Sequence, residues 1–407
     1  MSKNILVIGT LDTKGVEFLY LRDLIVARGH RALVLDTGVA GNPAFPPEIS
    51  AEAVAEAGGA SLESLRRAAD RGAALDVMGK GARVLALRAH AEGKVDGVIS
   101  LGGSGGTSIA TRAMQALPVG LPKVMVSTMA SGDVSAYVGV KDITMMYSVV
   151  DVAGLNRLSR RILANAVGAV CGMAEQVAPF SGADRPLVTA TMFGVTTPCV
   201  DRVRSRLEAA GYEVLVFHAT GSGGRAMEAL IKDGYVAGVA DITTTEWCDE
   251  LVGGVLSAGP ERLDAAAKAG LPQVVSLGAL DMVNFGAIET VPEKFRGRNL
   301  YKHNPTVTLM RTTPEECAEL GRIIAQKLNR ATGPTALYVP LRGVSMIDAE
   351  GKPFHWPEAD RALFEAIGKY LDRSRVELVE LDANINDPSF ADAMATRLLS
   401  LLKRGEK

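Results

Sequence analysis

One order of segments occurs twice along the 407-residue chain. In the second half three apolar runs follow one another as GYEVLVFHATGSGG, YVAGVADITTTEW and GLPQVVSLGALDMV. Their counterparts in the first half are GHRALVLDTG, VDGVISLGGSGGT and GLPKVMVSTMASGD, and each half also opens with a strand-like run that leads into an amphipathic helix. Apolar strands that alternate with amphipathic helices are typical of parallel sheets covered by helices. The repetition predicts an α/β protein with two doubly wound, Rossmann-like parallel-sheet domains related by internal duplication.

The junction between the two copies is predicted near residue 182. Helical periodicity extends over residues 155–178, and the segment SGADRP then breaks it. A chain of this length also exceeds one ordinary hydrophobic core. We therefore expect an N-terminal nucleotide-binding domain, residues 1–182, and a C-terminal domain, residues 183–407, that binds a substrate or a partner.

Composition limits the classes of partner. The chain is 47% apolar and 22% charged with a net charge of −2, as is ordinary for a soluble globular protein. No basic block favours nucleic acid, and no apolar run approaches the roughly 18 residues of a membrane span. No signal peptide leads the chain, so we expect a cytoplasmic protein that binds neither nucleic acid nor membrane. The scattered cysteines, without C-x-x-C spacing, predict buried reduced thiols.

The segment 95–107 predicts an anion site in the N-terminal domain. Its glycines permit backbone angles that other residues avoid, and they lack the Cβ atoms that would keep a ligand away. The helix that follows would add unpaired N–H groups and the positive end of its dipole. The alternative is a tight strand-to-helix turn without a ligand, because neither G-x-G-x-x-G nor the phosphate loop is matched. The residues concerned are Gly102, Gly103, Ser104, Gly105, Gly106 and Thr107.

Polar loops after three other expected strands should reach the same edge of the sheet, because ligands bind outside the carboxyl ends of parallel strands. Lys14 would neutralise phosphate oxygens, and Asp12 or Glu17 would hold magnesium through water. Alternatively, Asp12 and Thr13 cap the following helix. The residues expected at the nucleotide are Gly9, Thr10, Asp12, Thr13, Lys14, Asp36, Thr37, Ser127, Ser131 and Gly132.

The corresponding point of the C-terminal domain carries DITTTEWCDELVGG in place of the glycine turn, which predicts a single nucleotide site per chain. Asp241, Glu246 and Asp249 form either a metal site or ordinary capped and solvated positions. Cys248 is a weak candidate nucleophile because no histidine lies nearby in sequence. The stretch 279–305 is expected to be a lid or interface loop. It contains Asp281 and His303, and the histidine is either a metal ligand or proton carrier, or a structural residue.

An apolar surplus in the first half predicts self-association into a homodimer. The connection 134–150 and the helix over 155–178 carry more apolar side chains than one amphipathic stripe needs. A self-complementary patch on a two-fold axis would cover them, unless the second domain covers them within one chain. The residues are Tyr137, Met145, Met146, Tyr147, Val149, Val150, Leu155, Leu158, Ile162, Leu163 and Val167.

Several long words of the sequence carry a family resemblance. The words are GTLDTKGVE, GGSGGT, STMASGDVSAYVGVKDI, DITTTEWCDELVGG and HNPTVTLMRT, in this order over essentially the whole chain. They resemble the bacterial and plant family named for the ATP-binding domain of the tomato mosaic virus resistance protein. The resemblance implies two Rossmann-like subdomains, ATP and Mg²⁺ bound in the first, and dimers. It supports ATP contacts from Gly9, Thr10, Asp12, Thr13 and Lys14 and from 102–107, and it names no catalytic base.

Two classes of function are compatible with these features. The first is an ATP-dependent enzyme of small-molecule metabolism, in which phosphoryl transfer relies on positioning and charge neutralisation. The second is a nucleotide-sensing module that acts through a separately encoded protein partner. A third interpretation, a phosphosugar or dinucleotide site without ATP, is weakened by the absence of the Rossmann fingerprint from GTLDTKG.

Overall fold

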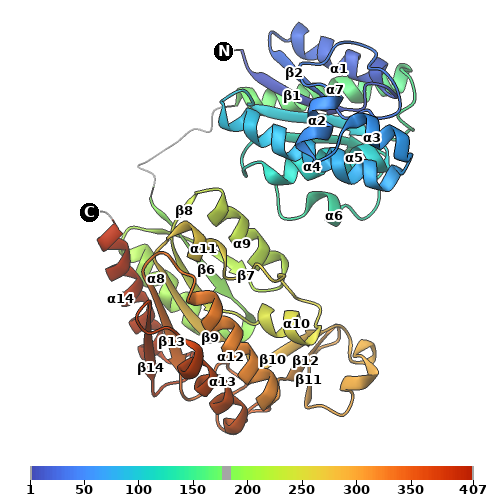
Figure 1. Ribbon diagram of the computed structural model, residues 1–407. Helices are drawn as coiled ribbons and strands as arrows, with labels where there is room; N and C mark the ends of the chain where they lie inside the picture. Colours follow the sequence, from blue (N-terminus) through green and yellow to red (C-terminus); the bar gives the residue numbers. More distant parts are fainter. Residues whose placement is uncertain (1, 177–184, 406–407) are drawn as a thin grey trace. The chain divides into compact units, whose positions relative to one another are not determined.

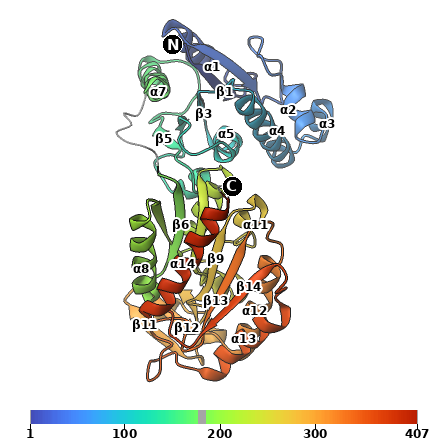
Figure 2. The same ribbon diagram turned by 90° about the vertical axis from the view of Figure 1, so that its left-hand side faces the viewer.

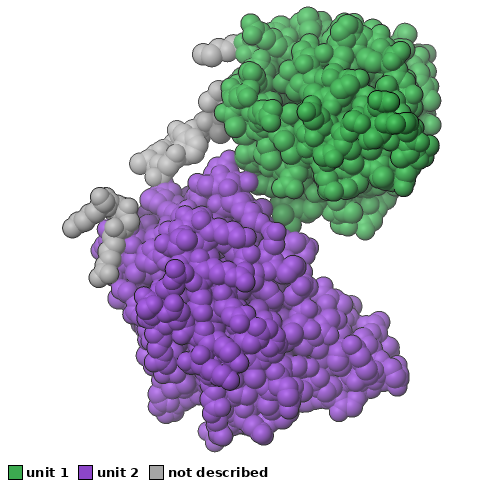
Figure 3. All heavy atoms as spheres, viewed as in Figure 1, with its two compact units in different colours: residues 1–181 green, residues 182–407 purple. Residues whose placement is uncertain are grey.

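The chain forms two compact units, residues 1–181 and 182–407 (Figure 3). Each unit has its own hydrophobic core. A computed structural model describes residues 2–176 and 185–405. The boundary predicted at residue 182 lies outside the described residues, as does the predicted end of the helix at Ala178.

The N-terminal unit (Figure 1) contains a five-stranded sheet in the order β2-β1-β3-β4-β5, with all neighbouring strands parallel. β1 and β2 pair without interruption from Asn4 opposite Arg31 to Gly9 opposite Asp36. The strands are β1 (Asn4–Gly9), β2 (Arg31–Asp36), β3 (Gly97–Gly102), β4 (Lys123–Ser127) and β5 (Thr144–Tyr147).

Helices cover both faces of this sheet. Because successive strand residues point to opposite faces, Ile5 and Val7 pack with α1 and α7, whereas Leu6 and Ile8 pack with α2, α4 and α5. The helix predicted over 155–178 begins at Arg157, where the side chain of Asn156 accepts hydrogen bonds from two backbone amides. The helices are α1 (Gly15–Ala27), α2 (Ala51–Ala57), α3 (Leu62–Ala68), α4 (Arg71–Ala91), α5 (Ser104–Ala116), α6 (Ser135–Val138) and α7 (Arg157–Glu175).

The C-terminal unit contains a six-stranded parallel sheet in the order β14-β13-β9-β8-β6-β7. Helices α8 and α14 pack on one face, and α14 crosses that face in Figure 2. The strands are β6 (Leu187–Met192), β7 (Glu213–His218), β8 (Val236–Thr243), β9 (Gln273–Gly278), β13 (Thr335–Pro340) and β14 (Val376–Leu381).

The other face of this sheet carries five helices, two of them headed by proline. Pro314 and Pro357 begin α12 and α13, where a missing N–H costs nothing. The helices of the unit are α8 (Thr197–Ala209), α9 (Ser222–Lys232), α10 (Glu246–Val252), α11 (Ala265–Ala269), α12 (Pro314–Leu328), α13 (Pro357–Tyr370) and α14 (Pro388–Gly405).

The stretch 279–305 is not the irregular loop that its sequence predicts. It contains β10 (Met282–Phe285) and β11 (Leu300–Asn304), which pair on either side of β12 (Val307–Arg311) in a small antiparallel sheet. All four residues of β10 are buried. No alternation of apolar and polar residues therefore marks this strand in the sequence.

The α/β class and the parallel sheets are confirmed, and the two units share a strand order. Renumbered within its unit, the second sheet reads 2-1-3-4-5-6, and the first reads 2-1-3-4-5. This order is common among doubly wound sheets. Internal duplication therefore stays a prediction.

Candidate functional site in the N-terminal unit

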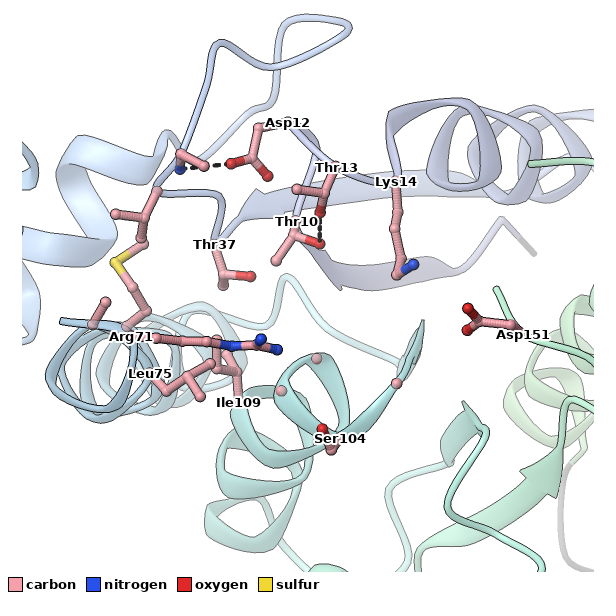
Figure 4. A pocket seen from close by; sticks show the side chains of 17 residues that line it. Thr10, Asp12, Thr13, Lys14, Thr37, Arg71, Leu75, Ser104, Ile109 and Asp151 are labelled. Carbon is pink, nitrogen blue, oxygen red and sulfur yellow. Dashed lines mark hydrogen bonds between the residues drawn. The ribbon is translucent and has the colours of Figure 1, made fainter. Parts of the chain in front are cut away.

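A cavity of about 510 Å³ opens at the carboxyl ends of β1, β2 and β3 (Figure 4). β1 lies between β2 and β3, so the chain leaves β1 and β3 toward opposite sides of the sheet, and doubly wound sheets bind ligands at such a point. The lining residues are Thr10, Asp12, Thr13, Lys14, Thr37, Val39, Ala40, Arg71, Ala74, Leu75, Met78, Gly103, Ser104, Gly105, Gly106, Ile109 and Asp151.

The glycine segment contributes the first turn of α5. Gly103 caps the helix with φ −81°, and no side chain of the described residues bonds the first helical amides, which leaves N–H donors at the cavity. None of Gly102, Gly103, Gly105 and Gly106 has a positive φ, so the expected use of unusual backbone angles is wrong. The missing side chain of Gly102 instead lets the backbone segments pack closely, because a Cβ atom there would lie 3.1 Å from Cα of Gly106.

The loop after β1 forms the opposite side of the cavity. Thr13 donates its hydroxyl to that of Thr10 at 2.9 Å, and Lys14 extends from the start of α1 (Figure 4). Asp12 holds the loop after β2, because its Oδ2 accepts the amides of Ala40 at 2.8 Å and Gly41 at 3.1 Å. Its Oδ1 is buried and has no hydrogen-bond partner in the described chain.

Eight predicted site residues lie outside the lining. The Glu17 carboxylate is 3% exposed and accepts the amide of Gly154 at 2.6 Å, so it is committed to the backbone. Asp36 accepts the amides of Leu11 and Gly38, and burial raises the pKa of its carboxyl. Thr107 and Ser127 bond each other at 2.7 Å in the interior. The eight residues are Gly9, Glu17, Asp36, Gly102, Thr107, Ser127, Ser131 and Gly132.

Sequence reasoning missed two charged residues of the lining, Arg71 and Asp151. Arg71 begins α4, and its guanidinium lies close to the first turn of α5: a Cβ atom on Gly105 would be 3.5 Å from Nη2 of Arg71. No hydrogen bond or ion pair engages Arg71 within residues 2–176 and 185–405. Asp70, which caps α4 through the amide of Ala73, was a signal in the sequence for a helix start at this point.

The matching edge of the C-terminal unit is filled by its own side chains. Arg262 is 1% exposed and donates to Asp241 at 2.5 and 2.6 Å and to Glu246 at 2.7 Å. The other oxygen of Glu246 accepts the amides of Gly221 and Gly224 at the start of α9. The Glu246 carboxylate thus accepts hydrogen bonds from helix-start amides, which in other proteins bind anionic ligands.

The other candidates of this unit are also committed to structure. Asp249 accepts two bonds from Asn284, and burial raises its pKa to about 7. Burial raises the pKa of the Cys248 thiol, which donates to backbone oxygens, so this thiol is no activated nucleophile. Across residues 2–176 and 185–405 no group of three or more His, Cys, Asp or Glu side chains is placed to hold a metal ion, which argues against the metal interpretation.

Asp281 and His303 differ in exposure. Asp281 is fully buried, accepts the Ser345 hydroxyl at 2.7 Å, and has its pKa raised to about 6 by burial. His303 is exposed on β11, and its ring centroid lies 6.5 Å from that of Tyr301. Neither residue lines the cavity of the N-terminal unit.

The fold and the cavity define a two-unit α/β protein with two doubly wound sheets and a cavity at the carboxyl ends of strands of the first sheet. The chain belongs to the uncharacterised protein family UPF0261. The model of the family's N-terminal domain matches residues 3–179, and that of its C-terminal domain matches residues 185–402.

Relatives confirm the predicted family. A UPF0261 protein of Clostridium tetani is 57% identical over 404 residues, which are 99% of this chain and 100% of that protein. A UPF0261 protein of Rhizobium meliloti is 53% identical over 96% of this chain and 97% of its own. The ToMV resistance protein Tm-1 of Solanum lycopersicum is 44% identical over 337 residues, which are 81% of this chain and 45% of that protein.

Two solved structures show weak similarity. A Streptomyces glycosyltransferase, SsfS6, complexed with thymidine diphosphate, is 15% identical with a TM-score of 0.20, over 99% of each chain. A UDP-N-acetylglucosamine 2-epimerase of Rickettsia bellii is 8% identical with a TM-score of 0.24, over 99% of this chain and 97% of its own. Similarity at this level carries no information about function.

Proposed function

We propose that the N-terminal unit binds ATP with magnesium in the cavity at the ends of β1, β2 and β3. One observation carries the proposal: the first turns of α4 and α5 both line the cavity, and the guanidinium of Arg71, which no hydrogen bond or ion pair engages in the described chain, lies close to Gly105 in the first turn of α5. The start of α5 presents unpaired amides, and both helices contribute the positive end of a dipole, although Asp70 already caps the amide of Ala73 in α4. Lys14 adds a second cation on the opposite side. This arrangement favours a ligand with several negative charges.

The size and polarity of the cavity fit a nucleotide. About 510 Å³ lies within the range of small-molecule sites. One wall is apolar and suits a base, whereas the donors lie around the start of α5 and the β1 loop and suit phosphates. The apolar wall consists of Val39, Ala40, Ala74, Leu75, Met78 and Ile109.

The residues also fit a magnesium ion carried in with the phosphates. Magnesium keeps several waters and takes few carboxylates. Asp151 has one oxygen bonded to the amide of Val152 and the other unpaired in the described structure, so it would hold a metal-bound water. Asp12 is less suited, since its Oδ2 serves two amides and its Oδ1 is buried.

Two roles for the bound nucleotide remain in competition. In an ATP-dependent enzyme of small-molecule metabolism, Lys14, Arg71 and the start of α5 would position and neutralise the transferred phosphoryl group. In a nucleotide-sensing module with a protein partner, the same residues would only bind the nucleotide, and no catalytic base is required. Single-turnover cleavage of ATP by the full chain, alone and with sugar acids, separates the two.

Calorimetric titration of the full chain with ATP and Mg²⁺ tests the site. Arg71→Met should weaken binding by roughly 10- to 150-fold, because a hydrogen bond to a charged group contributes about 1.5–3 kcal/mol. Arg83→Met is the matched control: Arg83 is exposed on the same helix and lies outside the lining. Equal affinities of the folded Arg71 variant and the control would refute the site.

We further propose a homodimer and a cytoplasmic location. Tyr147, Val149 and Leu158 are 43, 54 and 44% exposed at the end of β5 and the start of α7, which favours a covered apolar surface there. Leu163 and Val167, by contrast, pack in the core of the unit and cannot contribute to that surface. All four cysteines are unpaired and buried, as suits a reducing compartment. Within the described residues no helix is both long enough and apolar enough to span a bilayer.

A further inference from the structure

The segment 148–154, between β5 and α7, reaches the cavity through one residue and is conformationally strained. It brings Asp151 to the lining. Val149 has φ +64°, a left-handed conformation that a β-branched side chain rarely adopts. A tight turn surrounds it, in which the amide of Val150 donates to the carbonyl of Ser148 and the Ser148 hydroxyl donates to the carbonyl of Val150, both at 2.7 Å. Such strain persists only where neighbouring contacts enforce it.

Two residues at the start of α1 provide those contacts. The ammonium of Lys14 donates to the carbonyl of Val152. One turn further on, Glu17 accepts the amide of Gly154 at 2.6 Å. Glu17 is buried, but Lys14 is half-buried and also lines the cavity (Figure 4). One of the two contacts is therefore accessible to a ligand and the other is not.

We infer that Lys14 couples occupancy of the cavity to the conformation of the segment 148–154. Without ligand, its ammonium holds the segment by the Val152 carbonyl. A phosphate in the cavity draws the ammonium away, because hydrogen bonds between two charged groups are stronger than those to a neutral carbonyl. The segment then relaxes about Val149 while Glu17 still holds Gly154. The inference rests on the proposed binding of a phosphate-bearing ligand and adds a response of the protein to it.

A bound ligand usually slows hydrogen exchange near its site, but here we expect part of the cavity lining to exchange faster. ATP with Mg²⁺ should slow hydrogen exchange in 103–107, where the phosphates bind. It should accelerate exchange of the amides of Val150 and Val152, whose hydrogen bonds belong to the strained segment. The amide of Gly154, which Glu17 holds, should change less. Hydrogen exchange of the full chain, read by mass spectrometry on peptides covering both regions, measures the two effects together.

Variants test the role of Lys14 without any ligand. Lys14→Met should accelerate exchange in 149–153 by roughly tenfold or more, the effect of losing one bond from a charged donor. Adding ATP should then change that region no further. Lys94→Met, at an exposed lysine of the same unit, is the control and should leave 149–153 unchanged. Val149→Gly should slow exchange there by about fivefold, since glycine adopts positive φ without strain.

The outcomes distinguish this inference from the proposed function. Absence of any ATP effect in 103–107, with Lys14→Met still accelerating 149–153, would refute nucleotide binding and leave the contact between Lys14 and the segment intact. Normal exchange in 149–153 of folded, ligand-free Lys14→Met would overturn the inference, whatever ATP does. Slower exchange of 149–153 on addition of ATP to the unmodified protein would overturn it as well.

Discussion

Replacing Arg262 by methionine is expected to lower the free energy of unfolding of the C-terminal unit by about 3–5 kcal/mol, the usual cost of removing one partner from a buried ion pair. The guanidinium is 1% exposed and donates to Asp241 at 2.5 and 2.6 Å, to Glu246 at 2.7 Å and to Glu228 at 3.5 Å. Methionine fills much of the same volume without charge. The lowered free energy of unfolding therefore reflects the cost of leaving buried carboxylates without a cation, and not the cost of a cavity.

The pH dependence of this loss has a definite sign. Burial raises the pKa of Glu228 while the charge of Arg262 opposes that rise, so removing the guanidinium would raise the pKa of Glu228 in the folded state further. A carboxyl whose folded pKa exceeds its unfolded pKa binds more protons when folded, so stability falls as pH rises. The deficit of the variant should accordingly be larger at pH 8 than at pH 5.

Urea denaturation followed by tryptophan fluorescence provides the assay. Both tryptophans, Trp247 and Trp356, belong to the C-terminal unit, so the signal reports on that unit alone. Arg342→Met is the control, because the pair of Arg342 with Asp382 is 66 and 71% exposed and should contribute no more than about 1 kcal/mol. A deficit below about 1 kcal/mol for Arg262→Met, or one independent of pH, would refute the reasoning.

Three further predictions concern the cavity and the assembly. Gly103→Val should abolish detectable ATP binding, because the valine side chain would obstruct the phosphates. The variant should still fold, since the φ of −81° at Gly103 admits any residue and a Cβ atom would approach only Thr128, at 3.7 Å. Retained affinity would contradict the assignment. Calorimetry should find one tight nucleotide site per chain, and tight binding by residues 183–407 alone would contradict the expected asymmetry. Light scattering should find a dimer at micromolar concentration that Leu158→Glu disperses, whereas a monomer in the unmodified protein would exclude it.

The sequence predicts those parts of the fold that depend on neighbouring residues, such as an apolar strand, and it does not predict contacts between distant residues. The apolar run Ile5–Ile8 lies within β1, as predicted. Such a run indicates a strand because a strand buried on both faces needs apolar residues at every position. The role of Arg262 depends on carboxylates 16 to 34 residues away, and nothing in its neighbours distinguishes it from a solvated arginine. Arg71 likewise reaches the cavity only because α4 packs against α5. Spacing along the chain predicts neither arrangement.

In both units, helices begin at the carboxyl ends of the sheet strands, and the two units satisfy the first amides of these helices in different ways. A helix that begins at the end of a buried strand leaves amides and a positive dipole end that need a negative partner. In the C-terminal unit the chain supplies that partner itself: Glu246 serves the amides at the start of α9, and Arg262 balances its charge. At the start of α5 the described chain provides no capping side chain, and it places no anion against Arg71, which adds a cation there. An external anion can bind at the start of α5 without displacing an internal one, whereas at the start of α9 it would have to break a buried network. This difference in cost is why we expect one site per chain and assign it to the N-terminal unit.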